Sequence, residues 1–179
     1  MDCTIRACGR EDIETLTGII RASFRDVAER FDLTPENCPR HPSNCTAEWV
    51  RGDMDRGVVY YIIGHGGDAM GCVALEQANG NECYLERLAV LPDRRRCGLG
   101  KALVKYVLGQ AHRLEADRVG IGIIAEDMRL KEWYGTIGFV EGELKQFAHL
   151  PFRVTFMSYR IEGSSYDDSG HETAVLDRP

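Results

Sequence analysis

A short glycine turn before a helix is the stretch of this sequence best suited to chemistry. The segment "PDRRRCGLGKAL", residues 92–103, follows an apolar run that ends at Val90 and Leu91, and it carries Gly98 and Gly100. A strand, a turn and a helix in this order leave several backbone N–H groups free at the positive end of the helix dipole, which makes a site for an anion. The two glycines would let a phosphate approach the backbone without meeting a Cβ atom.

The three consecutive arginines of this segment allow a second interpretation, in which the turn is only a solvated, charged cap of a helix. A hydrogen bond to a charged group contributes roughly 1.5–3 kcal/mol, whereas an exposed arginine ion pair contributes about 0–1 kcal/mol. If the turn binds an anion, the backbone amides should therefore dominate, with the arginines at 94–96 assisting. Glycine spacing alone leaves both interpretations open.

Two segments resemble the GNAT superfamily of acetyl-CoA-dependent N-acetyltransferases. The stretch "LAVLPDRRRCGLGKAL" is similar to its acetyl-CoA signature, a Gln or Arg, two residues, Gly, one residue, then Gly or Ala, here Arg95, Gly98 and Gly100. The stretch "DMRLKEWYGTIGF" is similar to a later motif with a Tyr four residues before a Gly-Phe pair, here Tyr134 and residues 138–139. The two segments have the separation expected for the family, and together they favour the anion site.

The resemblance implies a binding site for acetyl-CoA as co-substrate. Backbone amides from Arg95 to Lys101 would hold the pyrophosphate, and the strand segment 88–90 would pair with the pantetheine arm, one N–H group polarising the thioester carbonyl. Asp127 stands where the family often has an Asn that contacts pantetheine. The implied cofactor-binding residues are Leu88, Ala89, Val90, Arg95, Arg96, Cys97, Gly98, Leu99, Gly100, Lys101 and Asp127.

Acetyl transfer to an amine needs a base for the amine and an acid for the departing thiolate. A free alkylamine has a pKa near ~10.4 and must lose a proton before it attacks. The resemblance implies that Tyr134 is the acid. Its phenol, with an ordinary pKa of about 10, is protonated at neutral pH. Without the motif, Tyr134 would be interpreted as a core aromatic beside Trp133.

The candidate base is a carboxylate, Glu86, in the strand before the glycine turn. In "ECYLERLAV", a strand without a bulge would place Glu86 on the same face as Leu88 and Val90, toward the cofactor. Many members of the family carry a Glu at this position. A carboxylate with an ordinary pKa of ~4.3 is a weak base, so it needs burial or a relaying water. A surface Glu86 paired across strands is the alternative role, and Glu76 is the reserve candidate.

The loop "CPRHPSNC" offers three soft metal ligands, Cys38, His41 and Cys45. Structural zinc needs four such ligands and no convincing fourth lies nearby, so we expect a proline-ordered loop and no metal. In GNAT folds the segment between the first two helices commonly lines the acceptor site. By that position alone, His41, Asn44 and Trp49 are expected to touch the substrate.

The remaining sequence predicts the elements that must position these residues. Apolar periodicity and turn signals predict strands near 3–8, 58–64, 69–76, 83–91, 118–126, 139–142 and 154–161, and helices near 10–31, 47–55, 99–114 and 128–137. Loops rich in Gly, Asn and Asp predict hairpins between the second, third and fourth strands. The expected fold class is α/β, the GNAT acyltransferase fold, with a mixed, mostly antiparallel twisted sheet of about seven strands flanked by about four helices.

Length and charge limit the class of protein. A chain of 179 residues suffices for one N-acetyltransferase domain, expected over 1–161, and a flexible polar tail over 162–179. A net charge of −6 argues against nucleic-acid binding, and no apolar run approaches the ~18 residues of a membrane helix. Seven cysteines without a Cys-x-x-Cys pair, and an N-terminus without a signal pattern, predict reduced thiols in a cytoplasmic protein.

These observations give one functional hypothesis and one alternative. We expect an N-acetyltransferase that moves acetyl from acetyl-CoA to a primary amine of a small molecule or peptide, by direct attack in a ternary complex. The alternative is a non-catalytic CoA-binding or sensing protein of the same fold. The acidic chain weakly favours cationic acceptors such as polyamines. Because dimers are common in the family, the resemblance also implies that a homodimer is possible.

Overall fold

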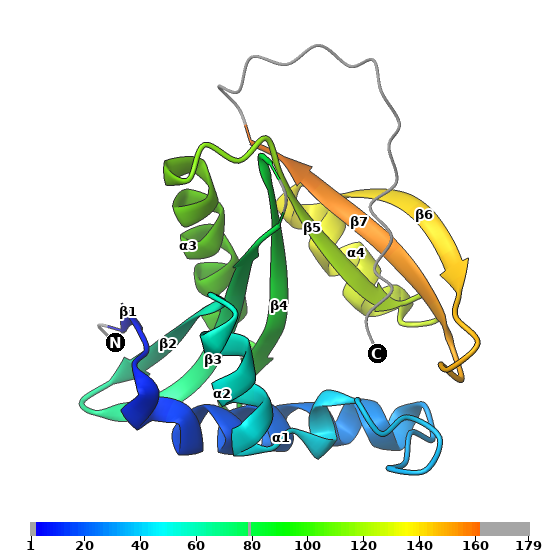
Figure 1. Cartoon of the computed structure of the whole chain (residues 1–179), viewed down its shortest axis with the longest axis horizontal. Helices are drawn as coiled ribbons and strands as arrows, with labels where there is room; N and C mark the ends of the chain where they lie inside the picture. Colours follow the sequence, from blue (N-terminus) through cyan, green and yellow to red (C-terminus); the bar gives the residue numbers. More distant parts are fainter. Residues whose placement is uncertain (1–2, 79, 162–179) are drawn as a thin grey trace.

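One twisted sheet with helices on both faces makes up the fold (Figure 1). The computed structural model describes residues 3–78 and 80–161. The strands of this part are β1 (Thr4–Ala7), β2 (Val59–His65), β3 (Asp68–Gln77), β4 (Glu82–Val90), β5 (Arg118–Ile124), β6 (Val140–Gln146) and β7 (Arg153–Arg160). The α-helices are α1 (Ile13–Arg30), α2 (Ala47–Asp55), α3 (Leu99–Arg113) and α4 (Met128–Ile137). The strand order β1-β2-β3-β4-β5-β7-β6 confirms the expected fold class.

Most predicted elements agree closely with the structure. The helices α2 and α4 have the predicted bounds, and Thr46 caps α2 by accepting a hydrogen bond from the Trp49 N–H at 3.4 Å. The largest difference is β6, which continues to Gln146 although the sequence predicted a strand ending near Gly142. Most β6 side chains are exposed, so the strand has no apolar alternation and is fixed by its pairing with β7.

The sheet opens between its two central strands. β4 and β5 are parallel and pair only over Glu82–Tyr84 and Arg118–Gly120, whereas all other neighbouring strands are antiparallel. β3 stays paired with β4 up to Val90, and β7 stays paired with β5 up to Ile124. The two halves of the sheet therefore diverge as intact units, and β4 and β5 form a V (Figure 1). Peptide groups along both facing edges of the V are left without a strand partner.

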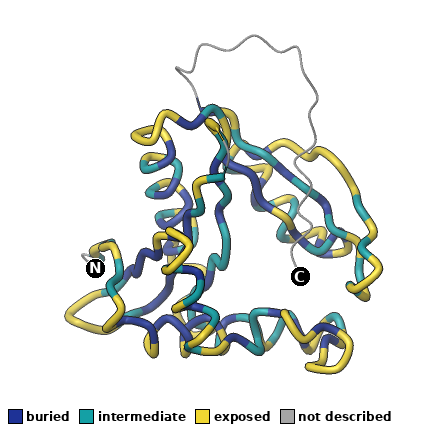
Figure 2. Tube along the Cα trace, in the orientation of Figure 1, coloured by how far each residue is buried: buried dark blue, intermediate teal, exposed yellow. Residues whose placement is uncertain are grey.

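Hydrophobic cores on both faces hold the sheet together. α3 buries Leu103 and Val107 on one face, and α1 buries Leu16 and Ile20 on the other. Figure 2 shows the buried residues concentrated along the central strands and the inward sides of these helices. A third, small cluster around Leu33 joins the end of α1 to β5 and the loop between β6 and β7, and so connects the two arms of the V.

The C-terminal tail and the absence of a membrane-spanning helix were also predicted from the sequence. The predicted tail, 162–179, lies outside the described residues, and a domain over 1–161 stays a prediction. Within the described part, none of the helices combines the length and the apolar character that crossing a bilayer requires.

The turn after α4 offers a test of the packing. Gly138 has a φ of +116°, and a Cβ there would lie 2.9 Å from Cε2 of Tyr159 on β7. Gly138→Ala should lower the free energy of unfolding by roughly 1–3 kcal/mol, because both the backbone angle and the ring oppose a methyl group. Gly135→Ala in α4, where a Cβ meets nothing within 4 Å, should raise it by about 0.5–1 kcal/mol. Denaturant unfolding measures both, and effects of equal sign would contradict this account.

Candidate functional site

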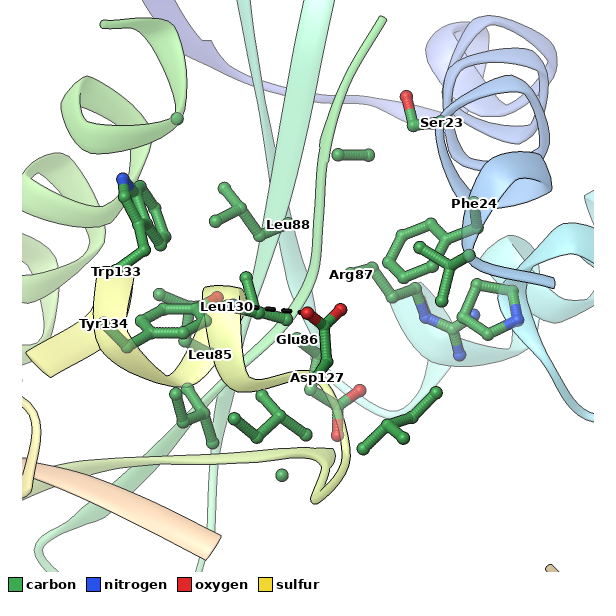
Figure 3. Close-up of a pocket in the computed structure, with 18 of the residues that line it drawn as sticks. Ser23, Phe24, Leu85, Glu86, Arg87, Leu88, Asp127, Leu130, Trp133 and Tyr134 are labelled. Carbon is green, nitrogen blue, oxygen red and sulfur yellow. Dashed lines mark hydrogen bonds between the residues drawn. The ribbon is translucent and has the colours of Figure 1, made fainter. Parts of the chain in front are cut away.

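A cavity of about 920 Å³ occupies the opening between β4 and β5. Its lining comes from both halves of the sheet, from α1, α3 and α4, and from the loop before α2. Figure 3 shows Leu85 and Leu88 of β4 between Trp133 and Tyr134 of α4 on one side and Phe24 of α1 on the other. The cavity therefore reaches both faces of the sheet through the gap in the V.

The glycine turn lines one end of this cavity. Gly98 is the N-cap residue of α3, and its φ of +82° lies in the left-handed region that favours glycine. The first N–H bonded within α3 is that of Ala102, which donates to the Gly98 carbonyl at 3.0 Å. The preceding N–H groups, at residues 99–101, have no capping side chain and are left for an outside acceptor. This arrangement suits a phosphate at the positive end of α3.

Most residues predicted for the turn border the cavity. Arg94, Arg95 and Arg96 line it, as do residues 98–101, whereas the exposed Cys97 lies outside the lining. Their contact with a cofactor stays a prediction.

The Arg95 side chain turns away from the anion site. Its guanidinium donates to both carboxylate oxygens of Asp26 on α1, at 2.6 and 3.1 Å, and to the Ser23 carbonyl at 2.6 Å. Its Nε donates to the Val90 carbonyl at 3.1 Å. The sequence suggested that the Arg95 charge assists phosphate binding. In the structure this side chain instead ties the glycine turn to α1 and β4.

The ion pair between Arg95 and Asp26 is fully formed at neutral pH. The hydrogen bonds from Arg95 lower the pKa of the Asp26 carboxyl. A carboxyl whose pKa is lowered by folding stabilises the fold above its ordinary pKa of about 3.9, and this contribution is lost as the pH falls through the lowered value. The position of the glycine turn should therefore be insensitive to pH in the range where an amine can attack.

The peptide groups of Leu88 and Val90 lie on the open edge of β4. The Leu91 N–H donates to the Met70 carbonyl of β3 at 3.0 Å. Because peptide groups alternate along a strand, those of Leu88 and Val90 point away from β3, toward the gap. Both residues line the cavity together with Ala89. An extended ligand could pair with this edge as an added strand would.

A β-bulge interrupts β4 beside the cavity. Cys72 of β3 pairs with Ala89, but Ala74 pairs with Glu86, so β4 has one residue more than β3 between these pairs. Arg87 lies in the bulge with a φ of +51°, which is unusual for a residue other than glycine.

The bulge changes which side chains share a face. Leu85 before it and Leu88 after it both pack against the core under α3, and Ala89 packs in the core with α1. The condition under which Glu86 would share a face with Leu88 and Val90, a strand without a bulge, is not met. Glu86 lines the cavity from the α1 face. The reserve candidate Glu76 pairs with Tyr84 and lies outside the lining.

A buried ion pair holds the bulge in place. The Arg87 guanidinium donates to Oδ2 of Asp53 on α2 at 2.8 Å, and the Tyr60 hydroxyl donates to the same oxygen at 2.6 Å. Arg56 donates to Oδ1 of Asp53, whose side chain is only 4% exposed. Sequence reasoning missed this network. The signal was a carboxylate three residues after Val50, on the apolar face of α2, because a buried carboxylate needs a buried partner.

Tyr134 is both a core residue and part of the cavity wall. Its side chain comes from α4, is 4% exposed, and makes T-shaped contacts with Trp133 and Phe139, with ring centroids 4.8 and 5.2 Å away. Burial raises the pKa of the Tyr134 phenol above its usual range, so the hydroxyl stays protonated at neutral pH. The two roles considered from the sequence are therefore compatible.

Asp127 lines the cavity but is engaged by protein groups. Its Oδ1 accepts a hydrogen bond from the Leu130 N–H at 3.3 Å, which caps α4. Its Oδ2 accepts one from Arg30 of α1 at 2.8 Å. The carboxylate thus fixes the start of α4 to the opposite arm of the V, and its predicted contact with a cofactor stays a prediction.

Of the three residues expected to touch the substrate, only His41 belongs to the described cavity lining, and its contact with a substrate stays a prediction. His41 lines the cavity, and burial lowers its pKa and keeps the ring neutral at pH 7. Within the described lining Asn44 and Trp49 do not appear. Asn44 donates to the Cys38 carbonyl at 3.3 Å, and the Trp49 ring lies under the guanidinium of Arg40, 5.4 Å from the ring centroid.

The two cysteines of this loop pack separately. Cys38 lies in the small cluster at the end of α1, and Cys45 lies in the core between α1 and the sheet. In the part of the chain that the structure describes, no three His, Cys, Asp or Glu side chains are grouped to hold a metal ion.

Fold and site together describe a split sheet whose cavity has a helix N-terminus suited to an anion at one end and an open strand edge beside it. The family model described as the Acetyltransferase (GNAT) family matches residues 15–139. The chain therefore belongs to the GNAT acetyltransferase family, which confirms the resemblance seen in the two motifs.

Solved structures of acetyltransferases share this fold. The ribosomal-protein-S18-alanine N-acetyltransferase from Escherichia coli is 15% identical, with a TM-score of 0.73 over 96% of this chain and 100% of that one. The PaiA N-acetyltransferase from Thermoplasma acidophilum, in complex with coenzyme A, is 17% identical, with a TM-score of 0.69 over 89% and 99%. The yncA protein from Salmonella typhimurium, solved with acetyl-CoA, is 16% identical, with a TM-score of 0.65 over 95% and 100%. At these identities the likeness shows the fold alone, and no curated protein sequence matches.

The ion pair under the bulge gives a test on stability. Asp53→Asn leaves the Arg87 charge buried without a full counter-charge and should lower the free energy of unfolding by roughly 3–5 kcal/mol. Asp55→Asn on the same helix removes only an exposed pair with Arg10 and should cost less than about 1 kcal/mol. Urea unfolding followed by tryptophan fluorescence compares the two. Equal losses would show that the buried pair does not stabilise the bulge.

Proposed function

We propose that this protein transfers the acetyl group of acetyl-CoA to a primary amine by direct attack in a ternary complex. The observation that carries the proposal is that Glu86 and Tyr134 line one cavity from opposite faces of the split sheet. An amine entering from the α1 face would meet Glu86, and a thiol held on the α3 face would meet Tyr134. Membership of the family supports acetyl transfer, and N-acetylation is in the names of the Escherichia coli and Thermoplasma acidophilum enzymes.

The described residues fit acetyl-CoA as co-substrate. The free N–H groups at 99–101 and the left-handed Gly98 offer a phosphate site, which the nearby Arg96 and Lys101 would strengthen by their charge. The open edge at 88–90 has peptide groups for an amide-containing arm. When bound, acetyl-CoA supplies the activated thioester that carries the acetyl group. The PaiA and yncA structures contain coenzyme A and acetyl-CoA.

Glu86 is the proposed base. An alkylamine is mostly protonated at neutral pH and must lose a proton to expose its lone pair. Glu86 borders the cavity on the face from which the amine would come. The proton passes to its carboxylate directly or through a water, and the neutral amine attacks the thioester carbonyl, which an N–H group of the open β4 edge polarises.

Tyr134 is the proposed acid. Collapse of the tetrahedral adduct breaks the C–S bond and leaves a thiolate that takes a proton, while the nitrogen of the new amide loses its extra proton to the resulting phenolate or to water. The Tyr134 hydroxyl stays protonated because burial raises its pKa, so it is a donor throughout the pH range in which an amine attacks. Asp127 and Arg30 hold the first turn of α4 and thereby fix the helix that carries Tyr134.

The proposal extends to the partners and location of the protein. We propose a small-molecule or peptide amine as acceptor, no nucleic-acid or membrane partner, and the cytoplasm as the site of action. The seven cysteines, all present as free thiols, support a reducing compartment. A homodimer stays a prediction.

Replacement of the acid tests the reaction. Tyr134→Phe should lower kcat about 10²–10⁴-fold, because a positioned proton donor is lost, with little change in acetyl-CoA affinity. Tyr106→Phe is the matched control. Tyr106 of α3 packs against Tyr61, with ring centroids 5.1 Å apart, and lies outside the cavity lining. Thiol release with a panel of amines and calorimetry with acetyl-CoA give both values. An unchanged kcat removes Tyr134 as the acid, and binding without thiol release from any amine would favour the non-catalytic alternative.

The contact between Arg95 and α1 predicts the sign of a second effect. Asp26→Asn frees the Arg95 guanidinium, which would strengthen acetyl-CoA binding if that group bound phosphate. We expect the opposite, a loss of roughly tenfold, or about 1.4 kcal/mol, because the glycine turn loses its anchor. Asp93→Asn is the control, since Asp93 is exposed and pairs with Arg94 in the same turn at 3.3 Å. Calorimetry at fixed salt decides, and tighter binding by Asp26→Asn would overturn the positioning role.

A further inference from the structure

The cavity extends over the α1 face of the sheet into an apolar groove. Gly122 is exposed although it lies within a central strand. A Cβ on it would lie 3.3 Å from Val154 Cγ1 and 3.5 Å from Phe156 Cε1, so these two β7 side chains flank a strip of bare β5 backbone. Tyr84 of β4 forms the opposite wall, with its ring against Gly120. We call these residues, Tyr84, Gly122, Val154 and Phe156, the Gly122 groove.

This groove is continuous with the proposed base. Tyr84 and Glu86 both precede the bulge and are two residues apart in β4, so they lie on the same face of the strand. At the far end, Phe147 of the loop between β6 and β7 contacts Phe156 edge-on, with ring centroids 6.4 Å apart. All these residues line the same cavity as Glu86. A molecule whose amine reaches Glu86 would therefore lay its next few atoms in the groove.

The charges around the cavity do not select a polycationic acceptor. Its described lining has three carboxylates, of which Asp26 is paired with Arg95 and Asp127 with Arg30, while Glu86 is the proposed base. Six arginines and one lysine share the same lining. Four of these arginines are ion-paired, with Asp127, Asp53, Asp93 and Asp26, and Arg96 and Lys101 border the phosphate site. The described lining therefore offers a molecule with several ammonium groups no acidic cluster.

We propose that the acceptor carries its primary amine beside a neutral, ring-sized apolar group, which occupies the Gly122 groove. This proposal rests on the proposed function and gives it a substrate class. A flat group can lie against bare backbone at Gly122, because no Cβ intervenes there. The rings of Tyr84 and Phe156 on either side offer the offset or edge contacts that aromatic groups prefer. The net charge of the chain, which suggested cationic acceptors, is set by residues outside this cavity.

A comparison of matched amines tests the proposal. With the full chain and saturating acetyl-CoA, kcat/KM for 2-phenylethylamine should exceed that for 1,4-diaminobutane at least about tenfold, as expected when an apolar group fills its pocket. Equal or preferred turnover of 1,4-diaminobutane overturns the acceptor class and leaves the proposed function intact. If acetyl-CoA does not bind and no amine releases thiol, both fail.

Two variants locate the effect in the groove. Gly122→Val fills it and should raise KM for 2-phenylethylamine about tenfold or more, while KM for ethylamine and acetyl-CoA affinity stay within about twofold. Gly142→Val is the control, because Gly142 is an exposed strand glycine of β6 whose Cβ would meet only the Phe156 carbonyl oxygen, at 3.5 Å.

Phe156→Ala enlarges the groove and tests the wall should Gly122→Val not fold. It should lower kcat/KM for 2-phenylethylamine about tenfold and leave that for ethylamine unchanged. Equal losses for both amines would overturn the proposal. So would a dimer that Phe156→Ala breaks without changing turnover of 2-phenylethylamine, because the groove would then belong to a second copy of the chain.

Discussion

The brief pairing of β4 with β5 is the constraint on which the rest of the structure depends. Two strands that separate after three residues each leave two rows of peptide groups without strand partners. A buried polar group left unpaired costs about 1–3 kcal/mol, so the gap cannot close over itself and must contain water or a ligand. The cavity between the arms follows from the absence of hydrogen bonds between β4 and β5 beyond these residues. The arms are then held at a fixed separation by the cluster around Leu33 and by the pair of Arg30 with Asp127.

The bulge in β4 divides this cavity into two chemical environments. By inserting one residue, it sends Leu88 to the α3 face and leaves Glu86 on the α1 face. A left-handed residue other than glycine costs of order 1–3 kcal/mol and persists only where its surroundings demand it. Here Arg87 is that residue, and the demand comes from Asp53 and Tyr60 beneath it. A buried ion pair is by itself weak evidence of added stability. In this protein it contacts the bulge residue Arg87, and the bulge leaves Glu86 on the α1 face.

Local patterns in the sequence were sufficient for most helices and strands and for the turn that lines the cavity, and the resemblance of two motifs to a known family supplied the fold class. The helix before Gly138 and the strand before Pro92 are encoded by contiguous residues, so their bounds and motifs could be predicted. The face of Glu86 could not, because a bulge is decided by the partner strand and by Asp53, over thirty residues away in the chain. The same holds for Arg95, whose partner on α1 is 69 residues distant. A contact between two segments far apart in the chain produces no periodic pattern of apolar residues in either segment, so the local sequence does not reveal it.

The three consecutive arginines show why net charge describes this cavity poorly. Arg94 forms an exposed ion pair with its neighbour Asp93, and Arg95 forms an ion pair with Asp26 of α1. Arg96, with a φ of +64°, is left to border the cavity. What a ligand experiences is the charge that remains after such internal pairing, not the sum over the chain. At the α3 end the free amides and Arg96 remain, which suits phosphates. At the Gly122 end the walls are the side chains of Tyr84, Val154 and Phe156, so we expect shape and apolar area to select the ligand there.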